Sequence, residues 1–303
     1  MKLSIVILNY NTADLLVKCV DSVMGERGKM GEKGERGEII VVDNGSTEPA
    51  FASPNRRASA RQAKIKYIYN EQNYGFAKGN NIGIKQTTGE YVLLLNPDTE
   101  IPEQGKGLSQ LIDFMDKNPQ IGIMTCRVEL LNGNLDDSCH RGFPTPWNAF
   151  CYFSGLSKVF SKNKLFAGYN LTYLNVKTIH EVDAVNGAFM LIRRKCGEEL
   201  NWLDEDYFWY GEDLDFCYRA KQKGWKVFFW PMMKIIHYKG VASGIKGGDT
   251  TASRETKIKA TEARFTVMKT FYDKHYKNKY PSWIAAAVLL SIELKKKWEM
   301  AKI

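Results

Sequence analysis

The stretch EYVLLLNPD, residues 90 to 98, decides the fold class. Its apolar run predicts a strand buried on both faces of a sheet, and the polar NPD that follows predicts the edge of that sheet. The chain before it repeats this pattern of an apolar run followed by polar residues. The earlier runs are LSIVILN (3–9), EIIVVDNGS (38–46) and KIKYIYN (64–70).

Helical patterns separate these predicted strands. After Asn11 or Thr12, which can cap a helix, apolar side chains recur at helical spacing. FAKGNNIGIKQ (76–86) and LSQLIDFMDKN (108–118) predict two more helices, and IGIMTCRVEL (121–130) returns to strand. Alternation of this kind predicts an α/β fold in which helices cover both faces of a mostly parallel sheet.

Beyond the last of these strands the pattern changes. Residues 132 to 182 mix glycine, proline, asparagine and aromatic residues, which is typical of long loops over a binding cleft. VDAVNGAFMLIRR (182–194) and WKVFFWP (225–231) predict strands on either side of a helix that begins near Glu212. The basic tail from Arg254 is predicted to be helical.

Two segments interrupt the alternation. GERGKMGEKGERG (25–37) has glycine at every third position, as collagen does, but four triplets without proline cannot form a triple helix. We interpret it as a charged, flexible loop insertion, with an oligomerising stalk as the alternative. Residues 49 to 63 are predicted to be a second loop insertion or a short basic helix.

The composition is that of a globular protein with a basic surface. Of 303 residues, 44% are apolar and 25% are charged, and the net charge is +9. This charge favours an acidic partner, such as a phosphorylated substrate, an anionic membrane surface or nucleic acid, although a basic surface without a particular partner fits as well. No nucleic-acid-binding module is recognisable, and we expect no nucleic acid partner.

The cysteines and the short apolar runs indicate a cytoplasmic protein. The six cysteines are widely spaced and form no C-x-x-C pair, as expected of free thiols in a reducing compartment. The first apolar run is too short for an export signal, and the longest late run, Trp283 to Ile292, is too short to span a bilayer. Peripheral attachment to the inner face of the cell membrane is left open.

Polar side chains collect where the predicted strands end. Asn9 and Asn11, Asp43 and Asp98 each follow an apolar run, and ligands of α/β sheets bind at the carboxyl ends of the strands. A divalent cation needs one or two carboxylates besides phosphate oxygens, and His237 is a candidate partner for Asp98. The structural alternatives are a turn or cap role for Asp98 and a buried structural role for the histidine.

YGEDLDF (210–216) places three acids at the start of a predicted helix. An ionised Asp213 could accept a proton from an incoming hydroxyl group. Asp215 lies two residues further on and faces another side of the helix, so it cannot share this role. Trp209 and Tyr210 could stack on a sugar ring or belong to the core. The structural alternative is that the acids only favour the helix dipole.

Other motifs narrow the function. The glycine-rich NYGFAKGNNIG (73–83) lacks the spacing of a Walker phosphate loop and of the dinucleotide fingerprint, which argues against an ATPase and a nicotinamide enzyme. No G-x-S-x-G or H-E-x-x-H motif is present. Asp43 and the backbone N–H groups beside it suit a nucleobase, and Tyr10 suits stacking on that base.

Together these stretches resemble glycosyltransferase family 2, specifically its bacterial rhamnosyltransferase-like branch. The resemblance covers residues 3 to 244, about four fifths of the chain, in the order of the family. It is carried by SIVILNYNTADLLVKCVDSV, EIIVVDNGS, NEQNYGFAKGNNIGI, GEYVLLLNPDTEI, VDAVNGAFMLIRR, FWYGEDLDFCYRAKQKGWKVFFWP and IIHYKGVAS.

The resemblance implies a GT-A fold, a Rossmann-like and mostly parallel sheet flanked by helices, with a C-terminal helical tail. We expect the catalytic domain at residues 1–245. Its nucleotide-binding half would cover about 1–130 and its acceptor-side half about 131–245. A basic helical tail would follow at 246–303.

The resemblance also implies roles for single residues. NPD stands where the family carries its D-x-D metal motif, so Asn96 replaces the first acid, and Asp98 would bind Mg²⁺ or Mn²⁺ together with His237. Asp213 would be the catalytic base, and Asp43 would contact the nucleobase. The other donor-binding residues are expected to be Asn9, Tyr10, Asn11, Gly79 and Asn80, the last where many relatives carry Arg, and the acceptor side is expected to include Trp209, Tyr210 and Glu212.

The implied activity is inverting transfer of a sugar from a nucleoside diphosphate to a hydroxyl group of a glycan or lipid-linked acceptor, in cell-surface polysaccharide synthesis. dTDP-rhamnose is the favoured donor, and galactofuranose, N-acetylhexosamine and glucose donors remain alternatives. The rival functions are a nucleotidyltransferase that forms sugar nucleotides and a non-catalytic protein that binds sugar nucleotides or polysaccharide. The sequence does not indicate an oligomeric state.

The tail is a separate hypothesis. Residues 283 to 298 combine tryptophan, isoleucine, valine and leucine with three consecutive lysines. They could form a helix that lies on an anionic bilayer, which would suit a lipid-linked acceptor. The alternative is a helix packed on the catalytic domain with a solvated basic end.

Overall fold

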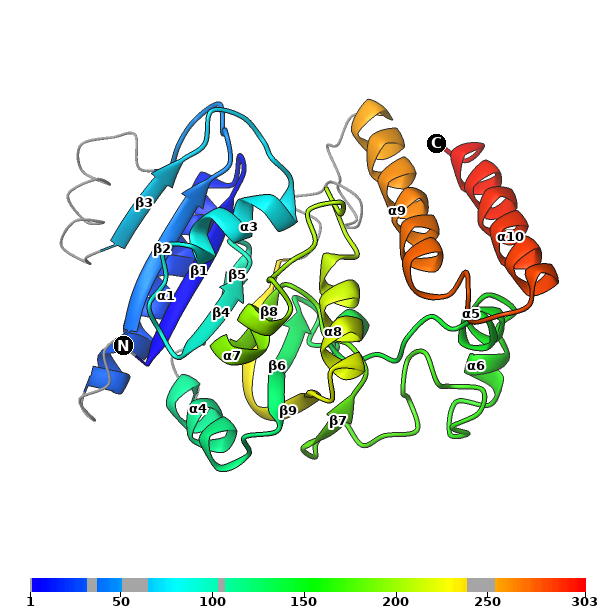
Figure 1. Ribbon diagram of the computed structural model, residues 1–303. Coiled ribbons are helices and arrows are strands. Elements are labelled where there is room, and N and C mark those ends of the chain that lie inside the picture. Colours follow the sequence, from blue (N-terminus) through cyan, green and yellow to red (C-terminus); the bar gives the residue numbers. More distant parts are fainter. Residues whose placement is uncertain (1, 32–36, 51–64, 103–106, 239–253) are drawn as a thin grey trace.

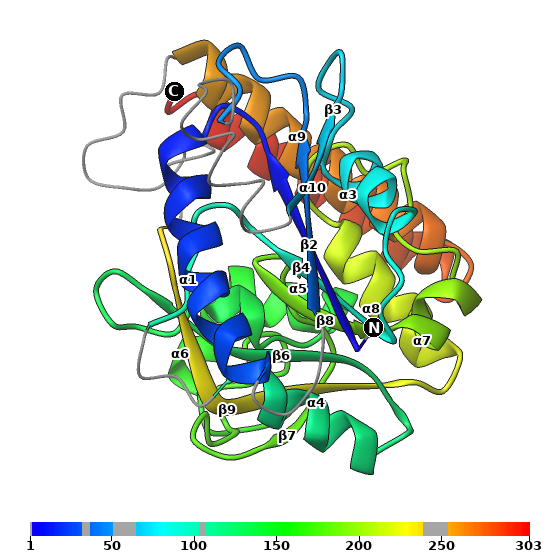
Figure 2. The same cartoon turned by 90° about the vertical axis from the view of Figure 1, so that its left-hand side faces the viewer.

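A central sheet with helices on both faces forms the body of the protein (Figure 1), and Figure 2 shows α1 and α3 on opposite sides of it. The computed structural model describes residues 2–31, 37–50, 65–102, 107–238 and 254–303. The strands are β1 (Leu3–Asn9), β2 (Gly37–Asp43), β3 (Ile65–Tyr69), β4 (Tyr91–Leu95), β5 (Thr99–Glu100), β6 (Ile121–Leu130), β7 (His180–Val182), β8 (Phe189–Arg193) and β9 (Lys226–His237). The helices are α1 (Ala13–Gly31), α3 (Phe76–Ile84), α4 (Leu108–Lys117), α5 (Pro146–Phe153), α6 (Leu156–Val159), α7 (Arg194–Glu199), α8 (Glu212–Gln222), α9 (Arg254–His275) and α10 (Ser282–Met300), with a 3-10 turn at Asp137–Cys139.

The strands join in one sheet with the order β3-β2-β1-β4-β8-β6-β9-β5, and β7 pairs with β9 beside this path. β1 lies parallel to β2 and β4, and β2 lies parallel to β3. The predicted α/β fold is therefore confirmed. The parallel half of the sheet consists of β1 to β4, which are the four strands predicted from the repeated apolar runs.

The second half of the sheet is mixed, which the sequence did not indicate. β8 runs antiparallel to both neighbours, β4 and β6. Its FMLIR run is as buried and as apolar as a parallel strand, so the pattern carries no information on direction. The predicted strand at 182–194 is also two strands, because the chain leaves the sheet between β7 and β8.

β9 joins two runs that the sequence separates at Pro231. The pairing partners of Cys126 and Arg127 on β6 are Trp230 and Lys234, so the register shifts where the proline stands. Proline lacks the N–H that a ladder needs and is tolerated at such irregularities. The strand continues past the shift and carries His237 to its carboxyl end.

α3 lies directly on β1 and β2. A Cβ atom at Gly79 would stand 2.6 Å from Leu8 Cδ1, and one at Gly83 would stand 2.6 Å from Val6 Cγ1. Any larger residue would push the helix away from the sheet. This contact explains two glycines of the NYGFAKGNNIG stretch as packing positions.

The two predicted loop insertions and the cysteines can also be compared with the structure. Residues 25–31, predicted to be a flexible loop, are the last part of α1, because the residues between the glycines are good helix formers. The remainder at 32–36, nearly all of the proposed insertion at 49–63, and the 239–243 end of the matching IIHYKGVAS stretch lie outside the described residues. All six cysteines are free and buried, as predicted.

The tail forms two helices of different character. Phe265, Phe271, Tyr272 and Tyr276, from α9 and the turn after it, are buried against the domain. α10 packs on α9 and has no fully buried residue. In the part of the chain that the structure describes, no helix has the length and apolar character needed to cross a membrane.

Candidate active site

The carboxyl ends of β1 and β2 are held together by a buried polar network. Asn9 Nδ2 donates to Asp43 Oδ2 at 2.9 Å, and Tyr67 donates its hydroxyl hydrogen to the same oxygen at 2.9 Å. The backbone N–H of Ser46 donates to Asp43 Oδ1 at 2.8 Å. Asp43 therefore fixes the turn after β2, and its predicted contact with a nucleobase stays a prediction.

Tyr10 and Asn11 continue from β1 onto the surface. Tyr10 is exposed, so its ring is open to a partner on that side. Asn11 adopts a left-handed backbone with φ of 55°, and its side-chain oxygen accepts from the backbone N–H of Thr47 at 2.9 Å. This contact holds the two turns side by side at the end of the sheet.

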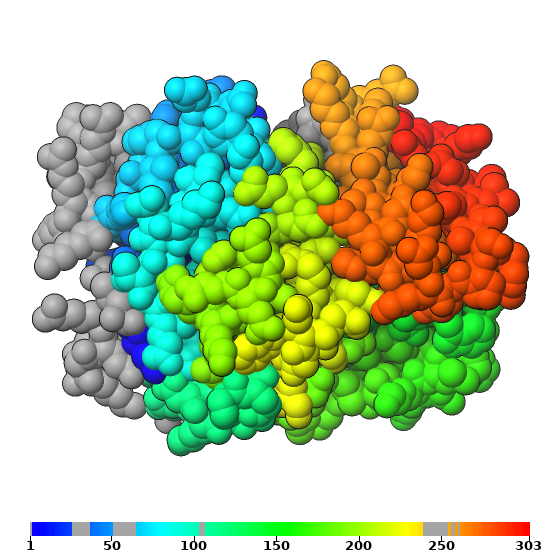
Figure 3. All heavy atoms as spheres, in the orientation of Figure 1, coloured from blue at the N-terminus to red at the C-terminus, as the bar shows by residue number. Residues whose placement is uncertain are grey.

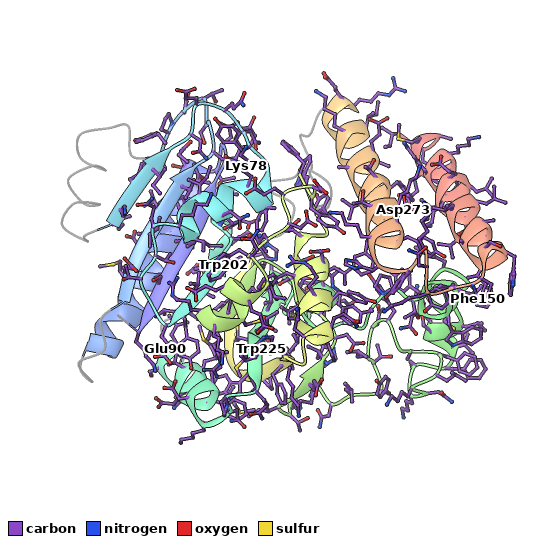
Figure 4. The ribbon with its side chains drawn as sticks, in the orientation of Figure 1. Lys78, Glu90, Phe150, Trp202, Trp225 and Asp273 are labelled. Carbon is purple, nitrogen blue, oxygen red and sulfur yellow. The ribbon has the colours of Figure 1, made fainter. Side chains whose placement is uncertain are left out.

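α3 presents different faces to the sheet and to solvent. Gly79 and Asn80 are buried, and Asn80 Nδ2 donates to the carbonyl oxygen of Phe76 at 3.0 Å. Both residues face the protein interior, and their predicted contacts with the donor stay predictions. Lys78 lies on the exposed side (Figure 4), with its ammonium group 4.9 Å from the centre of the Tyr74 ring.

Asp98 and His237, 139 residues apart, are brought together by pairing of β5 with β9. Thr99 stands opposite His237 in that antiparallel pair, and the carbonyl oxygen of Asp98 accepts from the N–H of Tyr238 at 2.8 Å. His237 Nε2 consequently lies 3.4 Å from Asp98 Oδ1, and both side chains are buried. The structure thus pairs the two residues predicted to bind a metal.

Asp136 completes this group from the other side of the imidazole ring. Its Oδ2 atom lies 3.2 Å from His237 Nδ1. Burial alone would lower the pKa of His237, but hydrogen bonds to Asp136 and Asp98 and their charges outweigh it and raise the pKa to about 9. The imidazolium therefore bridges two aspartates at neutral pH.

The Asp98–His237 pair fits a divalent cation. Two ligand atoms bound side by side at about 2.1 Å from an ion lie roughly 3 Å apart, close to the separation of Asp98 Oδ1 and His237 Nε2. A metal-binding histidine usually donates its other nitrogen to a carboxylate, as His237 does to Asp136. No group of three or more metal-binding side chains occurs among the described residues, so oxygens of a diphosphate and water would have to complete the coordination.

Asp213, the predicted base, forms an ion pair that the sequence did not indicate. Arg141 donates from a terminal guanidinium nitrogen to Asp213 Oδ2 at 2.9 Å, and both side chains are mostly buried. Burial alone would lower the pKa of Arg141, but the charge of Asp213 outweighs it and raises that pKa, so the guanidinium stays charged. Each carboxylate oxygen retains a lone pair for a further hydrogen bond.

Glu212 precedes Asp213 at the first position of α8 and is buried. Burial and the charge of Asp213 raise the pKa of Glu212 to about 8. The carboxyl group is therefore mostly protonated at neutral pH and can donate a hydrogen bond. Its Oε2 atom has no hydrogen-bond partner in the described part of the chain.

Two further buried polar atoms near Glu212 also lack partners among the described residues, namely Arg141 Nε and Asn186 Oδ1. The Asn186 amide nitrogen donates to Asp136 Oδ2 at 3.3 Å. The next residue, Gly187, lies so close to α8 that an added Cβ atom would stand 3.9 Å from Glu212 Oε1. Unpaired buried groups are rare in proteins, and a cluster of them indicates a place where a ligand supplies the partners.

The aromatic pair beside α8 has the geometry of a binding platform. The rings of Trp209 and Tyr210 are stacked, with centres 5.3 Å apart and planes at 10°. Tyr210 has a φ of 72° and Gly211 a φ of 86°, so two successive residues adopt the left-handed conformation at the start of the helix. Such strain in a non-glycine residue concentrates at functional sites.

Asp215 serves the fold instead. Its side chain is fully buried, and it accepts from Arg219 Nε at 2.6 Å and lies 2.7 Å from His275 Nε2 on α9. The prediction that Asp215 and Asp213 have different roles is consistent with these contacts. A cavity of about 470 Å³ between α3 and residues 200–206 is lined by none of the predicted site residues.

Most of the chain matches one known family. Residues 4–198 match the model of Glycosyl transferase family 2. The chain belongs to glycosyl transferase family 2. The expected resemblance to this family is thereby confirmed.

Curated family 2 relatives include proteins of glycan synthesis. The low-salt glycan biosynthesis hexosyltransferase Agl10 of Haloferax volcanii is 27% identical over 240 residues, covering 78% of this chain and 66% of the relative. The rhamnosyltransferase WbbL of Escherichia coli strain K12 is 27% identical over 175 residues, covering 54% of this chain and 61% of the relative. The chain thus spans no more than about two thirds of the length of these relatives.

Solved structures show that the family 2 chain has the GT-A fold. GalNAc-T7 with UDP, GalNAc and Mn²⁺ superimposes with a TM-score of 0.58 at 18% identity, over 86% of this chain and 48% of that one. The mannosyltransferase PcManGT of Pyrobaculum calidifontis, in complex with GDP-Man and Mn²⁺, gives a TM-score of 0.56 at 14% identity, over 99% and 72% of the two chains.

Three residues of the site were missed by sequence reasoning: Asp136, Arg141 and Asn186. The first two lie in the aperiodic stretch from 132 to 182, where no spacing marks one polar residue above another. The only signal was that this stretch was predicted to form loops over a binding cleft. Their roles follow from partners far away in the chain, namely His237 and Asp213.

Proposed function

We propose that the protein is an inverting glycosyltransferase acting in cell-surface polysaccharide synthesis. It would move a sugar, with rhamnose from dTDP-rhamnose favoured, to a hydroxyl group of a glycan or lipid-linked acceptor. The observation that supports this most is a linked set of polar residues. Asn186 donates a hydrogen bond to Asp136, the partner of His237, and the next residue, Gly187, lies against Glu212, so residues 186 and 187 connect the proposed cation site to the helix start that carries Asp213.

Asp98 and His237 would hold Mg²⁺ or Mn²⁺ in this proposal. When bound, the cation would stabilise the negative charge of the departing diphosphate. Asp136 would orient the imidazole ring of His237. Binding at Nε2 requires loss of the proton there, so affinity for the metal should rise with pH.

Asp213 would act as the general base. One of its carboxylate oxygens takes the proton of the acceptor hydroxyl while that oxygen attacks the anomeric carbon from the face opposite the diphosphate. The bond between the anomeric carbon and the phosphate oxygen breaks, and a nucleoside diphosphate leaves. Arg141 keeps the carboxylate in position, and protonated Glu212 offers a hydrogen bond to a sugar hydroxyl.

The donor can be identified by thermal unfolding in the presence of Mn²⁺. A ligand that binds only the folded state stabilises it by mass action, and ~100-fold excess over Kd should raise the melting temperature by about 5 °C. We expect dTDP-rhamnose to give a larger rise than UDP- or GDP-sugars. A larger rise with another sugar nucleotide would reject rhamnose, and no rise with any of them would argue against the proposed function.

The products separate this proposal from a nucleotidyltransferase. Incubation with donor and acceptor should release a nucleoside diphosphate. Release of pyrophosphate from a sugar phosphate and a nucleoside triphosphate would instead indicate the rival reaction.

Asp136→Asn tests the metal site through its supporting residue. We expect the affinity for Mn²⁺ in the presence of nucleotide to fall by about 10- to 100-fold, because the amide orients the imidazole less firmly and supplies no charge. Titration calorimetry measures this change. The neighbouring Asp137→Asn variant is the control, since Asp137 is exposed, and equal affinity in both variants would contradict the assignment.

The position of α10 at the surface allows the predicted attachment to a membrane through residues 283–298. A lipid-linked acceptor would then reach the site from the inner face of the cell membrane. We propose this location as part of the function.

A further inference from the structure

Exposed apolar side chains of the protein gather in two segments. Among the described residues, seventeen large apolar side chains are exposed, and eleven of them belong to residues 147–165 or to α10. The other six are scattered over the remaining, much longer part of the chain. Concentration of this kind marks an interaction surface, whereas single exposed apolar residues are ordinary.

α10 is apolar on two opposite faces. Its inner face packs on α9 and the core through Ala285, Val288 and Leu289. An ordinary surface helix is polar on the side away from the core, so the outer face of α10 requires another explanation. The outer row consists of Trp283, Leu290, Leu294 and Trp298, which recur every seven or four residues and are 56–72% exposed.

α5, α6 and the turn after them supply the second segment. Phe150, Val159 and Leu165 are 55%, 74% and 60% exposed. The ring of Trp147 lies 5.7 Å from that of Phe150, and its indole N–H donates to the carbonyl oxygen of Leu165 at 2.8 Å. Figure 4 shows Phe150 at the edge of the molecule, below α10 in that view.

The two segments meet and form one surface. The ammonium group of Lys295 on α10 lies 4.9 Å from the centre of the Phe153 ring on α5 and 5.1 Å from that of the Trp298 ring. Figure 3 shows the atoms of residues near 150–165 directly beneath those of the C-terminal helices. We call residues 147–165 and the outer face of α10 the docking surface.

The charges of the docking surface select an anionic partner. Residues 138 to 180 contain five cationic side chains and no aspartate or glutamate. Lys158, Lys162 and Lys164 are exposed, and none forms an ion pair within the described part of the chain. Aromatic and aliphatic side chains beside exposed lysines match the interface of an anionic bilayer, where rings enter the headgroup layer and ammonium groups meet lipid phosphates.

We propose that the docking surface binds an anionic lipid bilayer, with α5 and α6 as a second contact beside α10. This inference rests on the proposed function where it concerns the acceptor. The chain passes from Arg141, the partner of Asp213, directly into α5, so a bilayer at the docking surface would lie on the acceptor side of the site. The acceptor class that fits is a lipid-linked saccharide.

Co-sedimentation of the full chain with vesicles tests the proposal. We expect binding to phosphatidylcholine vesicles that contain about 30% phosphatidylglycerol, weakening with added salt, and much weaker binding to pure phosphatidylcholine. Replacing Phe150, Val159 and Leu165 together by Gln should lower the partition coefficient at least about tenfold, because three apolar side chains leave the interface. The matched control replaces three apolar residues that are exposed elsewhere, Tyr69, Leu131 and Met232, by Gln and should bind like the unmodified protein.

Equal binding of the two triple variants, or no binding of the unmodified chain to anionic vesicles, would overturn the proposal. Sedimentation velocity without lipid tests the alternative that a second copy of the chain occupies the docking surface. A dimer that is lost only in the Phe150/Val159/Leu165 variant would show that the surface is a contact between copies and would overturn the proposal. Donor-induced thermal shifts without lipid report on the proposed function separately. The thermal shift should be the same in both triple variants. If neither variant nor the unmodified protein shows a shift, the proposed function is rejected, whereas the result with vesicles still decides whether the docking surface binds a bilayer.

Discussion

Replacing Asp213 by Asn is expected to slow transfer at least about a hundredfold while the protein remains folded. Asparagine keeps the shape of the side chain, and its amide oxygen can still accept from Arg141, but it cannot take the proton of an acceptor hydroxyl. The rate of nucleoside diphosphate release measures the loss. A donor-induced thermal shift like that of the unmodified protein would show that the binding site is intact.

Asp215→Asn is the informative contrast, because the two aspartates are separated by one residue. Asp215 is fully buried between Arg219 and His275, so its neutral replacement should lower the free energy of unfolding by about 3 kcal/mol. At a temperature where this variant is folded, we expect its turnover to be close to normal. Near-normal turnover by Asp213→Asn would show that Asp213 is not the general base.

Replacing Glu212 by Gln is expected to stabilise the protein at neutral and alkaline pH. The pKa of Glu212 is raised to about 8, so between about pH 4 and pH 8 the folded protein holds a proton that the unfolded chain has released. The free energy of unfolding therefore falls as the pH rises through this window, by an amount on the order of a few kcal/mol. Glutamine cannot ionise and removes this loss.

Urea unfolding of both proteins at several pH values measures the effect. The stability difference in favour of the Glu212→Gln variant should grow from pH 5 to pH 8 and change little above it. Glu198, which has an exposed side chain on α7, provides the control, since Glu198→Gln should leave the pH profile unchanged. Parallel profiles for Glu212→Gln and the unmodified protein would show that the carboxyl group is not held neutral.

Transfer should also weaken as Glu212 ionises. A protonated carboxyl group can donate a hydrogen bond to a sugar hydroxyl, whereas the carboxylate beside Asp213 would add a second negative charge. Glutamine is neutral at every pH and its amide N–H can donate a hydrogen bond, so the Glu212→Gln variant should keep its transfer rate at alkaline pH, where the unmodified protein loses it.

Much of the parallel half of the fold follows from the sequence, because buried strands and amphipathic helices leave distinct periods in it. α4 and β6 begin and end close to their predicted bounds, and α8 begins at Glu212 as predicted. Strand direction left no such trace, and β8 is antiparallel although its composition matches that of β4. The continuous β9 was also hidden, since Pro231 reads as the end of a strand until its register shift is seen.

Some residues of the site could likewise be predicted from the sequence, and others could not. Resemblance to the family singled out Asp98 and His237, and the structure explains how pairing of β5 with β9 joins them. Asp136 and Arg141 lie in loops without period, so only the folded chain reveals what they contact. The first acid expected of a D-x-D motif is absent, because Asn96 stands there, and the carboxylate of Asp136 behind the histidine contributes a negative charge nearby.

The contact between Asp215 and His275 has a practical consequence for anyone who shortens this chain. The resemblance to the family implies that the catalytic domain ends near residue 245, but a protein ending there would lose α9. Without α9, Asp215 on the helix that carries Asp213 would lose its contact with His275. The core residues that pack against Phe271 and Tyr276 would be exposed to water. The smallest stable unit for expression should therefore run through Tyr280.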